Sequence, residues 1–281
     1  MSTQQAKPAA PKPAAPANKK SGGIPAGVII LILFAVALSL YKFVMGDPSH
    51  FENNNPDGHP IPGDYFGIVY KGGIIVPVLM TCFLISLTFS IERILTIGKA
   101  KGTGDINAFV RKIQASLDKD DVEGALKECD KQKGSVGNVT LAAVKKYKQL
   151  ATDGSLDKEQ KLAALSKEVE EATSLELPML EKNLTIIATL ASVSTLIGLL
   201  GTVVGMIKAF SALGNSGGST DSSALANGIS EALVNTALGI GTSAVCIIGY
   251  NFFTSKIDEL TYSVDEIGLS INQNYAAHHN W

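Results

Sequence analysis

A glutamate stands inside a long apolar stretch of the sequence. Glu231 lies in GISEALVNTALGIG, residues 228–241, and apolar residues continue from there to Phe253. A charged carboxylate at the centre of a membrane helix costs about 2.5 kcal/mol or more on insertion scales. Burial favours the neutral form of such a group, so it can bind and release a proton or coordinate a hard cation. We therefore take Glu231 as the first candidate for ion handling.

Further polar side chains would share the face of Glu231 in a helix. At 3.6 residues per turn, Asn235 and Thr242 fall in its sector, and Thr236 lies along the neighbouring edge. Lipid is a poor neighbour for such a stripe, so we expect it to face the interior of a helix bundle, a subunit interface or a water-filled path. The alternative interpretation is a structural hydrogen bond from Glu231 to a neighbouring helix.

The preceding apolar segment, residues 184–213, carries a stripe of small residues at steps of three and four. Its GTVVG motif, residues 201–205, has the small-xxx-small spacing that lets two membrane helices approach closely. We expect close helix packing from this stripe and from one glycine of the next segment. The packing candidates are Gly198, Gly201, Thr202, Gly205 and Gly239.

Four segments are apolar and long enough to place the chain in a lipid bilayer, namely residues 24–46, 72–91, 184–213 and 226–254. A crossing helix needs about 20 apolar residues. No small-x-small cleavage site follows the first segment, so we expect it to be a span and not a removed signal peptide. No alternating β pattern of any length appears. The sequence therefore predicts an all-α integral membrane protein with about four transmembrane helices.

The distribution of Lys and Arg predicts the orientation of the spans. The Ala/Pro/Lys-rich tail, residues 1–23, is basic and too poor in large apolar residues to order itself. Residues 92–183 open with basic residues and read as helices that extend from the spans, whereas the connections 47–71 and 214–225 are poor in Lys and Arg. The positive-inside rule then places both termini, including the tail 255–281, and the helical region in the cytoplasm, with the two connections facing outward.

Composition argues against several other classes of protein. A net charge of −2 does not suggest nucleic-acid binding. Cys82, Cys129 and Cys246 lack the spacing of a disulfide framework, and the four histidines lack convincing metal-ligand spacing. No nucleophile–base pair and no phosphate-binding loop can be recognised. We expect no catalytic residue, no cofactor and no metal site.

The last two apolar segments resemble the ExbB/TolQ/MotA proton-channel family, and more closely its ExbB/TolQ branch. Residues 198–205, GLLGTVVG, are similar to the GL-x-GTV-x-G stretch of that branch, and residues 228–239, GISEALVNTALG, are similar to its GI-x-EAL-x-TA-x-G stretch. The triplet Ile91-Glu92-Arg93 and the segment DDVEGALKEC also fit. The resemblance extends over roughly residues 72–255 and is specific in the last two spans.

The resemblance implies an ion channel, driven by protons, in the bacterial inner membrane, which would make the outward connections periplasmic. It implies a pentamer of this chain around a single-span ExbD/TolR-like partner that carries an aspartate. Motion of that partner would pass to a TonB/TolA-like periplasm-spanning protein and power outer-membrane processes such as TonB-dependent import. The resemblance places Glu231 at the family's membrane glutamate and Thr236 at its pore-facing threonine, and we add Asn235 to this ion pathway from the polar stripe.

Two features depart from the ExbB/TolQ pattern. Those proteins have three spans, whereas this chain has four apolar segments, a layout reminiscent of MotA. Val193 stands where the family has a second pore threonine, and Thr195 stands where ExbB and TolQ commonly have proline. We include Ser194 and Thr195 as candidate substitutes, because a ring of hydroxyls could serve either a water wire or sodium coordination.

Two other functions stay open. A stator subunit of a gliding or flagellar-type motor would share the channel chemistry and would have to contact its rotor through residues 92–183. A non-conducting membrane scaffold would need only the small-residue stripes, and it leaves Glu231 unexplained. Lys208 lies near the outer end of its segment, so its side chain can reach the membrane interface, with a partner contact as the alternative.

Overall fold

The computed structural model describes residues 26–56, 58–215 and 222–278. These ranges are helical and contain no β-strand; one isolated β-bridge joins Phe51 and Pro60. The prediction of an all-α protein is therefore confirmed. The tail predicted at residues 1–23, and residues 216–221 of the second outward connection, lie outside the described residues.

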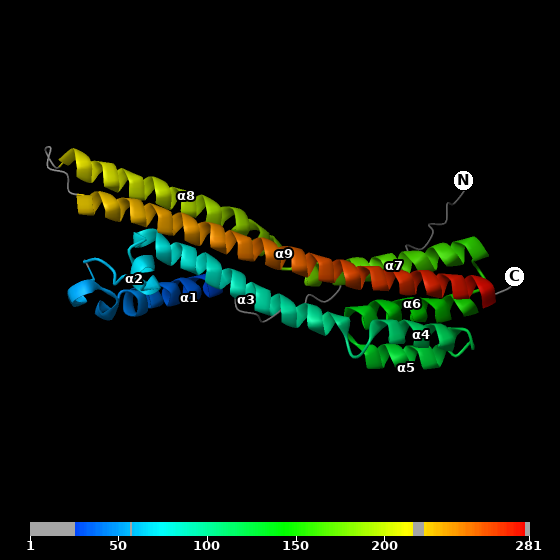
Figure 1. The fold of residues 1–281 in the computed structure, drawn as a ribbon. Coiled ribbons are helices and arrows are strands. Elements are labelled where there is room, and N and C mark those ends of the chain that lie inside the picture. The colour runs from blue at the N-terminus through cyan, green and yellow to red at the C-terminus, as the bar shows by residue number, and fades with distance from the viewer. Residues whose placement is uncertain (1–25, 57, 216–221, 279–281) are drawn as a thin grey trace, which may run out of the picture.

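Four helical stretches of the described chain are long and apolar enough to cross a membrane, which matches the predicted number. The first is α1 (Ala26–Ser39), which continues into the π-helix η1 (Leu40–Met45). The others are α3 (Val76–Lys101), α8 (Leu184–Asn215) and α9 (Ser222–His278). In Figure 1, α8 and the first half of α9 run side by side, and α3 lies along the same stretch of α9.

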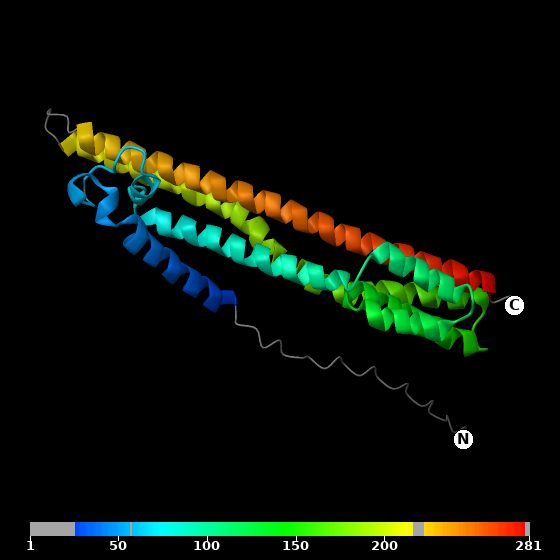
Figure 2. The same ribbon diagram turned by 60° about the horizontal axis from the view of Figure 1, so that its bottom comes forward.

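The small helix α1 packs on α3. Figure 2 shows it on the side of α3 that faces away from α8 and α9. Its link to α3 is a folded segment that we call the α1–α3 connection, residues 46–56 and 58–72, with η2 (Pro48–His50), η3 (Glu52–Asn54) and α2 (Tyr65–Tyr70). The 3₁₀-turn η4 (Gly73–Ile75) leads from it into α3.

The far half of the molecule is a soluble-type helix bundle. The helices α4 (Ile106–Leu117), α5 (Val122–Gln132), α6 (Gly134–Thr152) and α7 (Lys158–Glu181) gather around the second half of α9. Aspartates cap three of them: the carboxylates of Asp105, Asp121 and Asp157 each accept an amide hydrogen bond of 2.8 Å. Such caps satisfy amides that the first helical turn leaves free.

The bundle has an aromatic core that ties α9 to α6. The rings of Tyr147 and Tyr275 meet edge to face with 4.8 Å between centroids, and both side chains are fully buried. The Tyr147 hydroxyl also lies 3.0 Å from the amide oxygen of Asn274. The segment after the fourth span, predicted only as a tail, thus continues as helix and forms the centre of this bundle.

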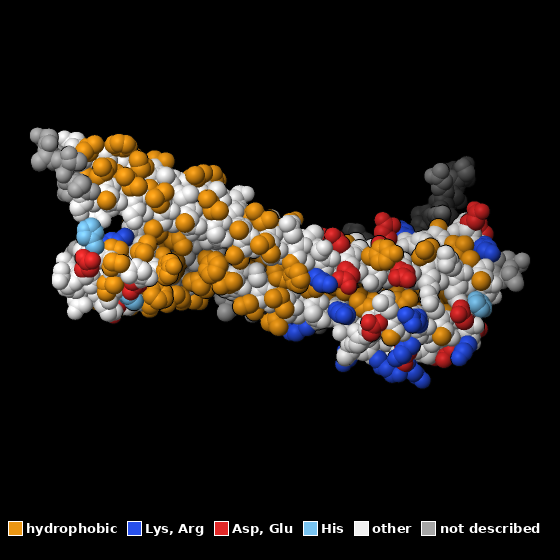
Figure 3. All heavy atoms as spheres, in the orientation of Figure 1, with side chains coloured by type: hydrophobic (Ala, Val, Ile, Leu, Met, Phe, Trp, Pro, Cys, Tyr) orange, Lys and Arg blue, Asp and Glu red, His pale blue; other side chains and the backbone are white. Residues whose placement is uncertain are grey.

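The two halves differ in surface chemistry. Figure 3 shows apolar side chains gathered over α1, α3, α8 and the first half of α9, and Lys, Arg, Asp and Glu over the helices α4 to α7. Large apolar side chains on the first half are widely exposed, among them Leu31, Ile74 and Ile248. A surface of this size and composition is suited to lipid or to neighbouring membrane helices.

Candidate functional site

Glu231 forms an ion pair with the lysine of the neighbouring helix. Its side chain on α9 is 11% exposed, and the Nζ of Lys208 on α8 lies 2.6 Å from its Oε1. The lysine side chain is 53% exposed, so the carboxylate of the pair is buried while the lysine remains accessible. A charge-assisted contact of this length is stronger than a neutral hydrogen bond, and it offsets part of the cost of burying the carboxylate.

The backbone of the Gly72–Gly73 turn packs against another side of the Glu231 carboxylate. Gly73 has a φ of +75°, and a Cβ built on it would lie 2.5 Å from Oε1 of Glu231. The preceding carbonyl, of Gly72, accepts a 2.8 Å hydrogen bond from the side-chain nitrogen of Asn235, which is completely buried. The turn between α2 and α3 therefore contacts two residues of the predicted polar stripe, and only glycine fits at Gly73.

Two hydroxyl groups join α8 and α9 about one helical turn from Glu231, in the C-terminal direction of α9. The Oγ1 atoms of Thr202 and Thr236 are in hydrogen-bond contact. Each also lies near the Gly198 carbonyl, at 3.3 and 3.4 Å respectively. Thr202 was expected to serve packing and Thr236 the ion pathway; the structure places the two together beside Asn235 and Glu231.

The glycines of the small-residue stripe lie where the two helices touch. A Cβ on Gly198 would come within 3.1 Å of the Gly239 Cα, and one on Gly205 within 2.7 Å of the Gly228 carbonyl. A Cβ on Gly201 would collide with the side chain of Asn235. Close backbone approach of this kind brings the residues of α8 within reach of the polar stripe on α9.

Ser194 and Thr195 lie apart from this cluster. The Ser194 carbonyl faces Gly239, which is eight residues along α9 from Glu231, or about 12 Å at the rise of an α-helix. Ser194 is fully buried, and its hydroxyl has no hydrogen-bond partner among the described residues. The hydroxyl of Thr195 bonds back to the Ala191 carbonyl at 3.3 Å. The candidates thus form one group around Glu231 and a second, separate group that contains Ser194 and Thr195.

A second ion pair, formed by the buried Arg93 and the 41% exposed Glu92, joins α3 to the end of α7, and its chemistry was not recognised from the sequence. Arg93 is 1% exposed, and its guanidinium bonds to both oxygens of the adjacent Glu92. Its Nη1 also donates to the carbonyls of Met179 and Leu180, at 3.0 and 2.8 Å. These carbonyls belong to the last turn of α7 and have no partner within that helix, so Arg93 acts as its cap.

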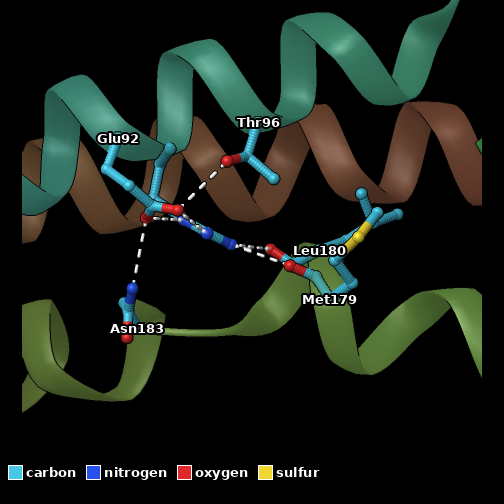
Figure 4. Close-up of polar contacts among 6 residues, drawn as sticks. Glu92, Thr96, Met179, Leu180 and Asn183 are labelled. Carbon is cyan, nitrogen blue, oxygen red and sulfur yellow. Dashed lines mark hydrogen bonds and ion pairs between the residues drawn. The ribbon is translucent and has the colours of Figure 1, made fainter. Parts of the chain in front are cut away.

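The carboxylate of this pair has two further partners, as Figure 4 shows. Asn183 donates to Oε2 of Glu92 at 3.2 Å, and the hydroxyl of Thr96 lies 3.0 Å from Oε1. Asn183 has a φ of +66° at the break between α7 and α8. The Glu92–Arg93 pair therefore holds together the point at which the apolar half joins the helix bundle.

Sequence reasoning missed the partnership of Lys208 with Glu231. The available signal was the presence of one charge of each sign in two neighbouring apolar segments, since opposite charges buried in membrane spans pair with each other. Among the described residues, no three His, Cys, Asp or Glu side chains group as a metal site would need, and the three cysteines are free and buried. The site therefore consists of one carboxylate, one ammonium, one amide and two hydroxyls.

Comparison with known proteins agrees with this picture. Residues 132–266 match the model of the MotA/TolQ/ExbB proton channel family. The biopolymer transport protein ExbB-like 3 of Synechocystis is 38% identical over 109 residues, which are 38% of this chain and 49% of that protein. The Tol-Pal system protein TolQ of Pseudomonas aeruginosa is 30% identical over 125 residues, 44% of this chain and 54% of that protein.

A further relative extends the match beyond the last two long helices. The biopolymer transport protein ExbB homolog of Methanothermobacter thermautotrophicus is 24% identical over 222 residues, 76% of this chain and 72% of that protein. The chain spans about half the length of the first two relatives. The family description names a channel and not a reaction, and residues 194–239, which hold every candidate of the site, lie inside the matched region. Over residues 132–266 the chain is therefore similar to the MotA/TolQ/ExbB proton channel family.

Proposed function

We propose that this chain is the proton-channel subunit of an energy-transducing complex of the TonB/Tol type, and that Glu231 is its ion-binding carboxyl. The observation that carries the proposal is the Lys208–Glu231 pair. It holds a carboxylate inside the apolar half of the molecule, and its lysine is half exposed and so can move away from the carboxylate. The match to a proton channel family supports the same assignment.

The surroundings of the pair suit reversible proton binding. When the carboxylate takes a proton, its attraction to Lys208 is lost, and the ammonium can turn toward the polar surface that already exposes half of its side chain. When the proton leaves, the lysine returns and stabilises the charge. The hydroxyls of Thr202 and Thr236 lie on the inner side of Glu231, and a hydroxyl both donates and accepts, so the two extend the path along α8 and α9.

The exposed apolar surface and the match to the family support an assembly with further subunits. A row of exposed apolar side chains on α8 includes Leu199, Val203, Ile207 and Phe210, and it lies beside the hydroxyl pair. We assign this face to other subunits: copies of this chain, in a pentamer, and a single-span ExbD/TolR-like partner in the pore. A TonB/TolA-like protein would carry the motion across the periplasm. In this arrangement the α1–α3 connection faces the periplasm, and both termini and the helix bundle lie in the cytoplasm of a bacterial cell.

The test is ion flux through the purified complex in liposomes, with the chain co-expressed with its single-span partner. Under an imposed pH gradient, with and without sodium, the Glu231→Gln variant should lose most of the flux of the wild type. Glu259→Gln is the matched control, because Glu259 lies on the same helix, is exposed and pairs with Lys256. Its flux should equal that of the wild type.

Other outcomes separate the alternatives. Sodium-dependent flux would identify sodium as the transported ion and would leave Glu231 as the proposed binding site. Flux that Glu231→Gln leaves unchanged would reduce Glu231 to a packing or hydrogen-bonding role. An assembled wild-type complex that conducts no ion would favour a non-conducting scaffold.

A further inference from the structure

The N-terminal helix is joined to the candidate site by packing that runs through the segment that follows it. α1 and η1 pack on α3 and on α2, away from the helices that carry Glu231 and Lys208. In η1 the ring of Tyr41 stacks on that of Tyr70, with 4.7 Å between centroids. The Tyr41 hydroxyl also donates a 2.9 Å hydrogen bond to the Tyr70 carbonyl. The first span is thus joined to the last residue of α2 by both a ring contact and a hydrogen bond.

The α1–α3 connection holds the same residues from its other side. Phe51 is 1% exposed and meets the Tyr70 ring edge to face at 5.5 Å. The Nζ of Lys71 lies 5.5 Å above the Phe51 ring and donates a 2.8 Å hydrogen bond to the Pro56 carbonyl. Buried aromatic pairs and charge-assisted hydrogen bonds restrict motion, so Tyr70 and Lys71 have a fixed position.

The next two residues are the ones that contact the site. The Gly72 carbonyl accepts the hydrogen bond from Asn235, and a Cβ on Gly72 would lie 2.9 Å from Val234 of α9. Gly73 packs against the Glu231 carboxylate with a φ that favours glycine. A continuous set of contacts therefore runs from α1, through Tyr70 and Lys71, to the outer side of Glu231.

We propose that the α1–α3 connection, anchored by α1 through Tyr41, is a positioning element that presses the Gly72–Gly73 turn against α9 and holds the Glu231 carboxylate toward Lys208. This inference rests on the proposed role of Glu231. A supporting group that fixes the rotamer of a functional side chain improves its geometry without taking part in the chemistry. Gly73 and Tyr41 are positioning residues in this sense, and they give the additional first span a role at the ion site.

The test compares two glycines of the same part of the chain. Gly73→Ala adds a methyl group that meets Glu231 and strains a backbone with φ +75°. Gly63→Ala is the control: it has a φ of +87°, so the backbone strain is similar, but a Cβ there would meet no atom within 4 Å. The difference between the two variants isolates contact with the carboxylate from strain in the connection.

The readout is the rate at which dicyclohexylcarbodiimide modifies Glu231 in the full chain in lipid vesicles at one fixed pH, followed by peptide mass spectrometry. This reagent reacts with protonated carboxyls. Gly73→Ala displaces the carboxylate from Lys208 and so favours its neutral form, and modification should be at least about threefold faster than in the wild type. Gly63→Ala should react at the wild-type rate.

A second variant keeps the inference testable if Gly73→Ala does not fold. Tyr41→Phe retains the stacked ring and removes only the hydroxyl that binds the Tyr70 carbonyl. It should accelerate modification in the same direction by a smaller factor. Wild-type rates in Gly73→Ala and Tyr41→Phe, or equal acceleration in Gly73→Ala and Gly63→Ala, would overturn the proposal. Absence of wild-type flux would instead refute the ion-binding role of Glu231, while the labelling rates would still report whether the turn positions its carboxylate.

Discussion

The two ion pairs at the ends of the apolar helices bury opposite members. Arg93 is enclosed, and its guanidinium bonds to Glu92 and to two backbone carbonyls of α7, whereas the Glu92 side chain is 41% exposed. In the other pair the carboxylate of Glu231 is enclosed, the Lys208 side chain is 53% exposed, and the ammonium bonds to Glu231 alone among the described residues. Each pair joins a long apolar helix to another element, but only the buried cation Arg93 has backbone partners besides its carboxylate.

The difference indicates how one type of interaction serves two purposes. A buried guanidinium that bonds to a carboxylate and to two backbone carbonyls cannot leave these partners without remaining charged and unpaired, so it fixes the structure. A half-exposed ammonium with one partner leaves it more readily, because other polar groups can replace the lost contact. We therefore interpret Glu92–Arg93 as a fixed joint between the two halves and Lys208–Glu231 as a pair that opens and closes.

The largest effect should follow from removing the enclosed cation. Arg93→Met leaves the last carbonyls of α7, those of Met179 and Leu180, without their donor, and each buried polar group left unsatisfied costs about 1–3 kcal/mol. The Glu92 side chain is 41% exposed, so its lost partner adds less. We expect a clearly lower midpoint of denaturant unfolding for the purified protein in detergent. The control is Arg111→Met, because Arg111 is an exposed residue of α4. Equal midpoints for the two variants would show that the joint contributes no more than a surface charge.

The half-exposed pair should give a smaller effect on stability and a larger one on transport. Lys208→Met should lower the free energy of unfolding by less than Arg93→Met does, because the buried Glu231 carboxyl can take up a proton and so avoids remaining as an unpaired charge. Because Glu231 would then have no cation beside it, it should remain neutral, react faster with carbodiimide and carry less ion flux. Lys256→Met, at the exposed Lys256–Glu259 pair of α9, is the control for both measurements. A variant that unfolds as readily as Arg93→Met yet conducts normally would reverse the roles that we assign to the two pairs.

These two pairs also show what the sequence could and could not predict. Glu231 stood out because one charged residue interrupts an apolar run, and the number of long helices followed from the length of such runs. The partner of Glu231 depends on the register between two helices, which no local pattern specifies. The same holds for Arg93, whose carbonyl partners are 86 and 87 residues away along the chain.

Contacts made by the backbone were even harder to predict from the sequence. Gly73 touches Glu231 because a turn with positive φ brings it there, and the spacing of residues in a helix predicts nothing about a turn that precedes a different helix. The packing glycines were easier to select, since a repeated step of three or four residues is a property of the sequence itself. Patterns within one helix could therefore be recognised, whereas contacts between elements required the structure.

A third pair, His50–Asp64 in the α1–α3 connection, should have the smallest effect of the three on stability. In the α1–α3 connection, the side chain of His50 bonds to Asp64 at 2.7 Å, and this hydrogen bond lowers the pKa of Asp64, as do the amides of Gly67 and Phe66, against a smaller effect of desolvation. A carboxyl with a lowered pKa in the folded state stabilises the fold above its unfolded pKa of about 3.9, and that contribution is lost as the pH falls through the folded value.

The connection should therefore loosen in acid below about pH 4 while the rest of the protein stays folded, since carboxylates lose their partners when protonated. Hydrogen exchange at the amides of α2, corrected for the intrinsic effect of pH, measures this, because Asp64 caps that helix. Asp64→Asn should show the faster exchange already at neutral pH and little further change in acid, whereas Glu52→Gln in the same connection should follow the wild type. If acid leaves exchange in α2 unchanged, the His50–Asp64 pair contributes nothing to the connection, and the restraint on the Gly72–Gly73 turn must come from Tyr41, Phe51 and Lys71 alone.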